Sequence, residues 1–294
     1  MKILIVGGTG QVGRDLQRAL EPLGDIMAPS RAHLDLADPN SIAQVWEQYR
    51  PDAVVNAGAY TAVDDAEAHS DHADAINHRA VDILAQLVER HHGWLVHYST
   101  DYVFNGQGAE PFDESAPKAP LNIYGRSKLA GDEAIVASGC RHLILRTSWV
   151  HAPRGRNFVS TILKLAADRD HLRVVADQHG APTSAALIAD VTAIALRRAL
   201  ANDEISGTYH VTAAGETSWH EVAQFAVTVA RKRGAVLTLR PEAIDAIGTA
   251  DYPLPAARPL NSRLDTTRFR HTFDVALPDW HDGVERTVAG LVAA

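Results

Sequence analysis

Short apolar runs alternate with longer segments of helical periodicity through the first half of the chain. The apolar runs predict buried strands at residues 2–6, 25–28, 53–56, 94–99 and 142–146. Between them, apolar residues recur at helical spacing, which predicts helices at residues 14–20, 41–49, 73–91 and 124–138. Strands that alternate with helices are typical of a doubly wound parallel sheet, so the pattern predicts an α/β fold.

The pattern becomes less regular after residue 150. Helical spacing continues at residues 157–168, 184–201 and 219–233, and a short strand is expected at residues 208–211. The proline-bearing stretch at residues 252–269 predicts a loop. We therefore expect a sheet domain at residues 1–150 and a smaller, partly interwoven lobe at residues 151–294. Elements such as the helix at residues 184–201 are expected to return to the sheet.

A glycine-rich segment, GGTGQVG, separates the first strand from the first helix. Its spacing fits G-x-x-G-x-x-G and G-x-G-x-x-G, and a strand, glycine turn and helix in this order are the fingerprint of a dinucleotide-binding Rossmann domain. Gly7 and Gly10 would let the backbone approach a pyrophosphate, and Gly13 would let the helix pack closely on the sheet. A glycine turn that only shapes the chain is the alternative.

The end of the second strand bears on the choice of coenzyme. An acidic residue there often holds the ribose 2′-hydroxyl of NAD, but this chain has Ser30 and Arg31. An arginine can accept the additional phosphate of NADP, and Asp35 and Leu36 follow where a loop would cover the adenine. The sequence therefore favours NADPH, with NADH as the other option.

A tyrosine and a lysine stand four residues apart at the start of the predicted helix 124–138. Tyr124 and Lys128 are thus one helical turn apart, and Thr100 ends a predicted buried strand. Reduction of a ketone needs a proton on the carbonyl oxygen, and a lysine ammonium would lower the pKa of a tyrosine that supplies it. The threonine hydroxyl could hold the carbonyl oxygen. With a dinucleotide turn in the same chain, this set predicts hydride transfer to or from a carbonyl.

Composition and charge exclude several other classes. The formal net charge of −8 over 294 residues argues against non-specific nucleic-acid binding, and the apolar runs are too short for a membrane span or a signal peptide. One cysteine, Cys140, excludes an internal disulfide and a cysteine-built metal site. The fifteen histidines include no H-E-x-x-H motif, and Ser99 lies in no G-x-S-x-G elbow. We expect a cytoplasmic enzyme.

The motifs together resemble those of the extended short-chain dehydrogenase/reductases, and within them the dTDP-4-dehydrorhamnose reductase family. The resemblance runs almost end to end. It is carried by the segments GGTGQVG, VNAGAYTAVDDAE, HYSTDYVFNGQGAEPFDE, YGRSKLAGDE, RTSWVHAPRGRNFV, DQHGAPTS and RPLNSRLDT. It implies reduction of the 4-keto group of dTDP-4-dehydro-L-rhamnose to dTDP-L-rhamnose, a nucleotide-sugar substrate.

The resemblance also implies roles for individual residues. Tyr124 is the implied proton donor, Lys128 its partner and the ribose anchor, and Thr100 the hydrogen-bonding partner of the carbonyl. The residues implied to line the coenzyme are Gly10, Gln11 and Val12 at the pyrophosphate, Asp35 and Leu36 at the adenine, and Ala59, Tyr60 and Thr61 on the far side. The residues implied to contact the sugar are Asp101 and Trp149, with Asn261 and Arg263 from the smaller lobe.

Two other functions and one metal site stay open at this point. Nucleotide-sugar epimerases and dehydratases share the glycine turn and the Tyr-Lys pair, and one relative is a non-catalytic regulatory subunit of a methionine adenosyltransferase. Some relatives hold Mg²⁺ between subunits with acidic residues, so a homodimer is compatible with the resemblance. Asp15 fits one of those acidic positions, but Ala186 occupies another, which makes Mg²⁺ doubtful, and no metal ligand is assigned.

Overall fold

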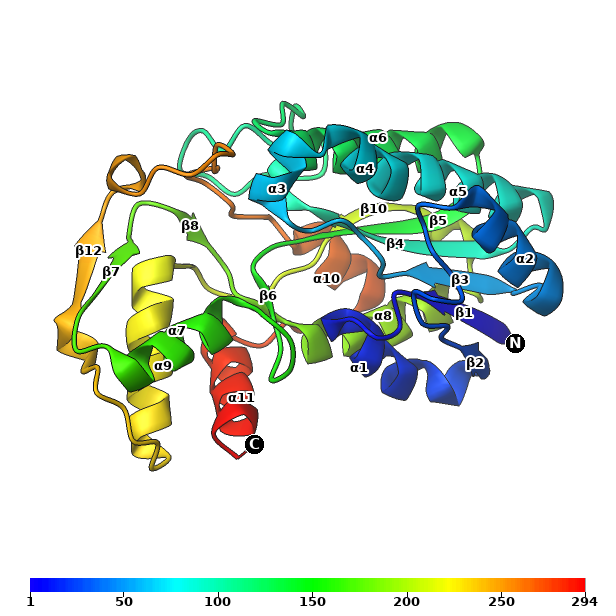
Figure 1. Ribbon diagram of the computed structural model, residues 1–294. Helices are drawn as coiled ribbons and strands as arrows, with labels where there is room; N and C mark the ends of the chain where they lie inside the picture. Colours follow the sequence, from blue (N-terminus) through cyan, green and yellow to red (C-terminus); the bar gives the residue numbers. More distant parts are fainter. Residues whose placement is uncertain (294) are drawn as a thin grey trace.

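A six-stranded parallel sheet forms the centre of the molecule, as shown by a computed structural model that describes residues 1–293 (Figure 1). From one edge to the other its strands are β2 (Asp25–Met27), β1 (Lys2–Val6), β3 (Ala53–Asn56), β4 (Trp94–Thr100), β5 (Arg141–Thr147) and β10 (Gly207–His210). Every neighbouring pair is parallel. The predicted α/β fold with a doubly wound parallel sheet is confirmed.

Helices cover both faces of this sheet (Figure 1). One face carries α1 (Gln11–Leu20), α8 (Ala185–Ala199) and α10 (Thr267–Phe273), and the other carries α2 (Pro39–Tyr49), α4 (Ser70–Asp74), α5 (Ala80–Arg90) and α6 (Ile123–Ser138). Alternate residues of each strand face opposite layers because side chains point to opposite sides of a strand. Ile3 and Ile5 thus join the α1–α8 core, while Leu4 joins the α2–α5 core.

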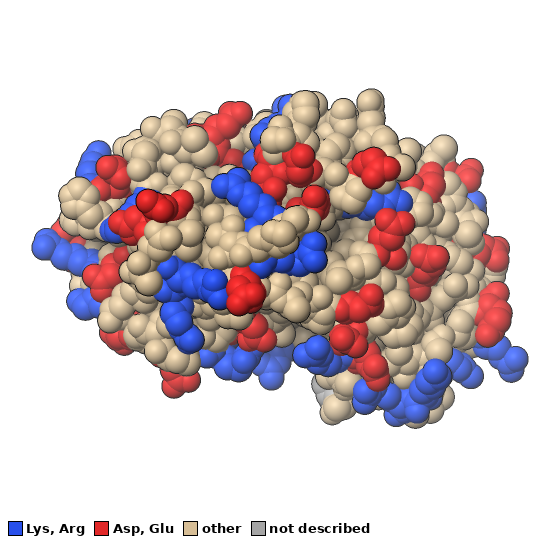
Figure 2. Space-filling model, turned by 180° about the vertical axis from the view of Figure 1, so that it is seen from behind, with Lys and Arg blue, Asp and Glu red and all other residues tan. Residues whose placement is uncertain are grey.

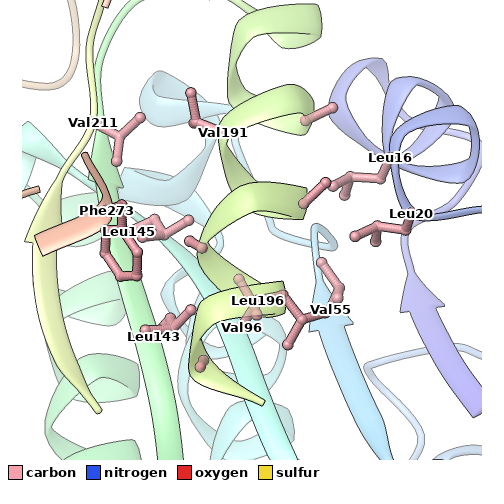
Figure 3. Packing of buried hydrophobic residues seen from close by; sticks show 14 of the residues in the cluster. Leu16, Leu20, Val55, Val96, Leu143, Leu145, Val191, Leu196, Val211 and Phe273 are labelled. Carbon is pink, nitrogen blue, oxygen red and sulfur yellow. The ribbon is translucent and has the colours of Figure 1, made fainter. Parts of the chain in front are cut away.

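The helix at residues 185–199 lies against the sheet although it comes from the second half of the chain. In Figure 3, Leu196 of α8 lies beside Val55 of β3, Leu16 and Leu20 of α1 point toward α8, and all four side chains are buried in one cluster. The cluster also contains residues of β10 and α10. The sheet is therefore completed by segments that lie beyond residue 150, while the domain boundary itself remains a prediction.

The remainder of the second half forms a smaller lobe at one end of the sheet (Figure 1). It consists of α7 (Phe158–Asp168), α9 (Trp219–Lys232) and α11 (Trp280–Val292), with a parallel pair of strands, β7 (Leu172–Val175) and β12 (Ile244–Ile247). Two apolar clusters of its own hold it together. The short elements that join it to the sheet domain are β6 (Val150–His151), β8 (His179–Gly180), β9 (Thr183–Ser184) and β11 (Thr217–Ser218).

Two predicted elements differ from the structure. The single helix expected at residues 73–91 is three successive pieces, α4, a π-helical segment (Ala75–Arg79) and α5. The loop expected at residues 252–269 ends in the first turn of α10, whose Phe269 and Phe273 lie one turn apart and are fully buried. Burial of both rings favours a helix over a loop, because the two side chains then lie on one face.

The order of the strands places a crevice at one end of the sheet. The chain moves outward from β1 in both directions, to β2 on one side and to β3 on the other. Ligands of such sheets bind beyond the carboxyl ends of the strands at this reversal.

On the face shown in Figure 2, acidic and basic side chains are interspersed. Within residues 1–293, no helix is long and apolar enough to cross a membrane.

Candidate active site

A cavity of about 850 Å³ lies where the carboxyl ends of β1, β3, β4 and β5 meet the smaller lobe. Its walls include the segments that follow those four strands, the first turn and a half of α6, and one ring from α9. The predicted site residues that line it are Gly10, Gln11, Val12, Ala59, Thr61, Thr100, Asp101, Tyr124, Lys128 and Trp149. Segments that are far apart in the sequence therefore meet at one site.

The glycine turn after β1 brings the N-terminus of α1 to this cavity. Gly7 has φ +75°, a conformation that side chains disfavour, and the Gly10 N–H donates to the Gly7 carbonyl at 2.9 Å. A Cβ at Gly13 would lie 2.1 Å from the Gly7 oxygen, so only glycine allows this packing. No side chain within residues 1–293 caps the first turn of α1. Its free N–H groups fit the pyrophosphate of a dinucleotide.

A loop of the smaller lobe covers the glycine turn. Asn157 Nδ2 donates to Gln11 Oε1 at 2.9 Å, and Gln11 Nε2 donates to the Arg156 carbonyl at 3.5 Å. The same loop brings Arg154 and Arg156 to the cavity wall, next to Arg14 of α1. Sequence reasoning missed these arginines and Asn157, because a link across some 145 residues leaves no local pattern.

Helix α6 holds Tyr124 and Lys128 at the cavity wall. Its N-cap, Asn122, accepts from the Gly125 N–H at 2.8 Å and donates to the Ala257 carbonyl at 2.8 Å, which fixes the start of the helix. Gly125 packs so closely that a Cβ would lie 2.3 Å from the Tyr102 oxygen. Tyr124 and Lys128 therefore keep fixed positions relative to β4.

Burial dominates the ionisation of both side chains. It raises the pKa of the Tyr124 phenol, which the charges of Asp101 and Asp132 raise further while a hydrogen bond with Thr100 acts in the opposite direction. Burial lowers the pKa of Lys128 to about 8, against the charge of Asp132. Lys128 Nζ donates to the Tyr98 carbonyl at 2.7 Å and lies 3.0 Å from His97 Nε2. Tyr124 is thus a neutral acid, and the expected lowering of its pKa by Lys128 is not seen.

Thr100 and Asp101 form the floor of the cavity beside Tyr124. Thr100 Oγ1 donates to Asp101 Oδ1 at 3.1 Å and accepts from the Tyr102 N–H at 3.2 Å. Burial raises the pKa of Asp101 to about 6, against hydrogen bonds from Ser262 and Thr100. Its other oxygen, Oδ2, has no hydrogen-bond partner within residues 1–293. A buried carboxyl oxygen at a cavity wall fits a hydroxyl group of a bound ligand.

An aromatic pair forms the wall opposite the strands. Trp149 stacks on Trp219 of α9 with ring centroids 3.7 Å apart, and both rings line the cavity. Gly180 makes room for this pair, because a Cβ there would lie 2.9 Å from the Trp149 ring. A flat apolar surface next to a buried carboxyl group is suited to a sugar ring. Sequence reasoning identified Trp149 and missed Trp219.

Comparisons with known proteins agree with this geometry. The family model described as RmlD substrate binding domain matches residues 1–292. Curated dTDP-4-dehydrorhamnose reductases are similar over the whole chain: one from Salmonella typhimurium is 46% identical, covering 99% of this chain and 98% of its own length. Another, from Burkholderia thailandensis, is 45% identical with 100% coverage of both chains. The chain belongs to the dTDP-4-dehydrorhamnose reductase family.

A solved structure of the family gives the same result. The crystal structure of the Bacillus anthracis dTDP-4-dehydrorhamnose reductase, in complex with NADP, matches with a TM-score of 0.88 at 33% identity and covers 98% of each chain. The family and the oxidoreductase class that the sequence predicts are confirmed. The roles of the individual site residues remain predictions for this member of the family.

Several of the predicted coenzyme residues lie outside the walls of the cavity. Arg31 is exposed, with its Nε 3.7 Å from Asp35 Oδ1, and Ser30 contacts His33 at 2.9 Å. Leu36 is buried in the α2–α5 core. Tyr60 Oη donates to Asp65, and the Tyr60 N–H donates to Asn77 Oδ1 at 2.8 Å. The structure therefore places Ser30, Arg31 and Asp35 together at a separate, partly exposed position after β2.

The two residues predicted from the smaller lobe are also outside the cavity walls. Arg263 pairs with Glu216 at 2.6 Å and lines a second cavity of about 870 Å³. Asn261 is buried and donates to the Glu110 carbonyl at 2.9 Å. Their neighbour Ser262, by contrast, lies close enough to Asp101 at the floor of the site to lower the pKa of that carboxyl group. The segment around residue 262 thus reaches the site, while Asn261 and Arg263 contact other parts of the chain.

Asp15, the acidic residue that the resemblance linked to a metal, has another carboxylate near it. Burial raises the pKa of Asp15 on α1, the Arg18 charge lowers it, and the charge of Asp190 raises it. Asp190, one turn beyond Ala186 on α8, is therefore the carboxylate near Asp15, and it pairs with Arg18 at 2.8 Å. Within residues 1–293, no group of three or more His, Cys, Asp or Glu side chains is placed to hold a metal ion.

Proposed function

We propose that this member of the family reduces dTDP-4-dehydro-L-rhamnose to dTDP-L-rhamnose, with NADPH as the preferred coenzyme. The observation that carries the proposal is the convergence of Thr100, Tyr124 and Lys128 on one cavity with the glycine turn of α1. An epimerase or a dehydratase would use a similar Tyr-Lys pair, but the full-length similarity to reductases supports reduction.

Tyr124 is the proposed proton donor. Its raised pKa keeps the phenol protonated at neutral pH, so Oη carries a proton that it can transfer to the carbonyl oxygen. Thr100, which lines the cavity with Tyr124, would hold that oxygen. The nicotinamide, when bound, supplies the hydride. Proton transfer to oxygen and hydride transfer to carbon together convert the ketone to the alcohol.

The proposed coenzyme site extends from the glycine turn to α6. The free N–H groups of α1 would bind the pyrophosphate, with the nearby guanidinium groups of Arg14, Arg154 and Arg156 as further partners. Arg31 is exposed and has only a distant carboxylate partner, so it can swing to a 2′-phosphate. The NADP complex of the Bacillus anthracis relative supports NADPH as the preferred coenzyme.

The substrate would lie between the aromatic pair and the floor of the cavity. Asp101 Oδ2 can accept a hydrogen bond from a sugar hydroxyl group, and Trp149 offers a flat face to one side of the ring. The nucleotide part would extend toward the smaller lobe, where Asn261 and Arg263 remain predicted contacts. A homodimer and a cytoplasmic location also remain predictions.

The test is NADPH oxidation with enzymatically prepared dTDP-4-dehydro-L-rhamnose, for the wild type and for Tyr124→Phe. The substitution removes one hydroxyl group, so turnover should fall roughly a hundredfold or more, the usual scale for a lost general acid, while NADPH binding is kept. Tyr102→Phe is the matched control, because it removes the same hydroxyl group from a neighbouring ring. The centroids of the two tyrosine rings are 5.5 Å apart, and the rings meet edge to face. Near-normal turnover by Tyr124→Phe would contradict the assignment.

The product identifies the function if the assay gives another result. A change of sugar configuration without net consumption of NADPH would identify an epimerase. No change in sugar or coenzyme, together with tight binding of a partner enzyme, would identify a regulatory subunit.

A further inference from the structure

A histidine is buried directly behind Lys128. His97 lies in β4, fully inaccessible to solvent, and its Nε2 is 3.0 Å from Lys128 Nζ. On the other side of the ring, Nδ1 is 3.2 Å from Asn56 Nδ2 of the neighbouring strand β3. Proton transfer from Tyr124 to the carbonyl oxygen involves neither His97 nor Asn56.

The donors and acceptors of Asn56, His97 and Lys128 determine where each proton lies in this row of three side chains. Asn56 Oδ1 accepts from the Gly58 N–H at 3.1 Å, so the amide presents its NH₂ group to His97. Nδ1 of His97 must then accept, and the single proton of the neutral ring stays on Nε2. That N–H points at Lys128 Nζ. An ammonium group has no lone pair, so only the uncharged amine can accept this hydrogen bond.

We propose that His97, oriented by Asn56, is a positioning residue that donates through Nε2–H to the uncharged amine of Lys128 and so favours the loss of a proton from Lys128. The role of this proton in turnover rests on the proposed reductase function. Burial and the Lys128 charge both hold the pKa of His97 well below its usual value, so the ring itself stays neutral.

The other groups around Lys128 either favour its charged form or do not distinguish between its two charge states. Asp132, one turn further along α6, favours the charged form of Lys128. Its carboxylate is itself paired with Arg146 of β5 at 3.1 Å and accepts from Ser99 Oγ at 2.9 Å. The Tyr98 carbonyl accepts from either form of Lys128. Burial and the His97 N–H therefore favour the uncharged amine of Lys128, while Asp132 favours its ammonium form.

These opposing influences suit the proton transfers of the reaction. When Tyr124 gives its proton to the sugar oxygen, a phenolate remains. The Lys128 ammonium can return one proton to that phenolate, and the amine that is left accepts the His97 N–H. One proton from solvent then restores the ammonium. The sum is one hydride from the coenzyme and one proton from solvent per ketone reduced.

The charge of Lys128 can be measured directly, because the chain contains only five lysines, at positions 2, 118, 128, 164 and 232. We would label lysine with ¹³C at Cε, assign the Lys128 signal by its loss in Lys128→Met, and titrate the wild type and His97→Gln. Glutamine can present its oxygen to Lys128, which stabilises the ammonium. The titration midpoint of Lys128 should rise by about half a pH unit or more, the equivalent of about one hydrogen bond.

The matched control is Tyr98→Phe, a neighbouring change in β4 that keeps the backbone carbonyl bound to Lys128. It should leave the Lys128 midpoint unchanged. In the kinetic assay, the pH at which kcat/KM changes should move upward with His97→Gln by the same amount. An unchanged or lowered midpoint in His97→Gln would overturn the proposal.

A second measurement uses only the wild-type protein, so it does not depend on the folding of a variant. The ¹⁵N shifts of the His97 ring in the wild-type protein at pH 9 should show a protonated Nε2 and an unprotonated Nδ1. The opposite tautomer at that pH overturns the proposal. Both NMR measurements are independent of turnover, so a failure of the proposed reductase activity can be distinguished from a failure of this inference.

Discussion

The backbone of Trp149 carries a conformational cost at the site. Its φ of 51° lies in the left-handed region, which for a residue with a large side chain costs on the order of 1 kcal/mol or more. The conformation brings the indole ring onto Trp219 and into the cavity wall. Such a cost persists where the surrounding packing imposes it, and here Gly180 and Trp219 confine the ring on two sides.

Gly180→Ala tests whether the position of this ring matters. The added methyl group would lie 2.9 Å from the Trp149 ring and 3.1 Å from Ser262 Cβ, so the ring must move. We expect KM for the nucleotide sugar to rise about tenfold, the scale of one lost contact of about 1.4 kcal/mol, with little change in NADPH affinity. Gly248→Ala is the control, because the nearest atom to its Cβ would be 3.5 Å away. Equal KM values for both variants would contradict the role of Trp149.

Residues at the site differ in how far the sequence alone could identify them. The glycine turn and the Tyr124–Lys128 spacing are local patterns, so they could be predicted, and both line the cavity. Asn56 ends the apolar strand β3 and His97 follows three apolar residues in β4, and no periodicity distinguishes either from an ordinary core position. Their relation to Lys128 arises only when β3, β4 and α6 pack together.

At the scale of elements, the π-helical segment connects the loop after β3, which contains Tyr60, to α6. Within it, Asn77 is buried and accepts from the Tyr60 N–H at 2.8 Å. Its Nδ2 donates to the Tyr60 carbonyl and to Ser127 Oγ of α6, each at 3.0 Å. An extra residue in a helical turn often occurs at functional sites, and here the π turn contains the side chain that links both elements.

Asn77→Ala should remove the connection between the loop after β3 and α6. Three hydrogen bonds are lost, and the buried polar groups left behind cost roughly 1–3 kcal/mol each, partly relieved by local movement. We expect the free energy of unfolding in urea to fall by about 2–4 kcal/mol, and NADPH to bind several-fold more weakly because the segment after β3 moves. Gln48→Ala, at an exposed helix position, is the control. An unchanged unfolding midpoint for Asn77→Ala would contradict this account.

The sequence predicted the strong elements and missed those that depend on distant partners. The strand at residues 94–99 and the helix at residues 124–138 differ from β4 and α6 by one residue at one end. The pair of β7 and β12 was not predicted, because each strand has only four residues and its partner lies some seventy positions away. The helix expected at 73–91 is interrupted by the π-helical segment that contains Asn77, and the side-chain partners of Asn77 lie outside that helix.

At the scale of the whole molecule, buried histidines set how stability depends on pH. Burial lowers the pKa of His151 to about 4 and that of His210 to about 3, and it also lowers that of His97. The unfolded chain, with an ordinary histidine pKa near 6.5, binds these three protons as the pH falls below that value, while the folded protein does not. Asp101 acts in the opposite direction, because its pKa of about 6 means that the folded state binds its proton first.

Between about pH 6 and pH 4 the unfolded state therefore holds about two more protons from these four groups than the folded state, three from the histidines less one from Asp101. The stability that these four groups contribute should be present in full above pH 6.5 and decrease below it, by roughly 3 kcal/mol per pH unit at about 1.4 kcal/mol for each proton. Urea unfolding at pH 7.5, 6 and 5 would measure this. His151→Gln removes one of the three histidines and should reduce the slope by about one proton, while His33→Gln, at an exposed position, should leave it unchanged. A slope that is flat in the wild type, or equal in the wild type and His151→Gln, would show that these buried rings are already protonated in the folded protein.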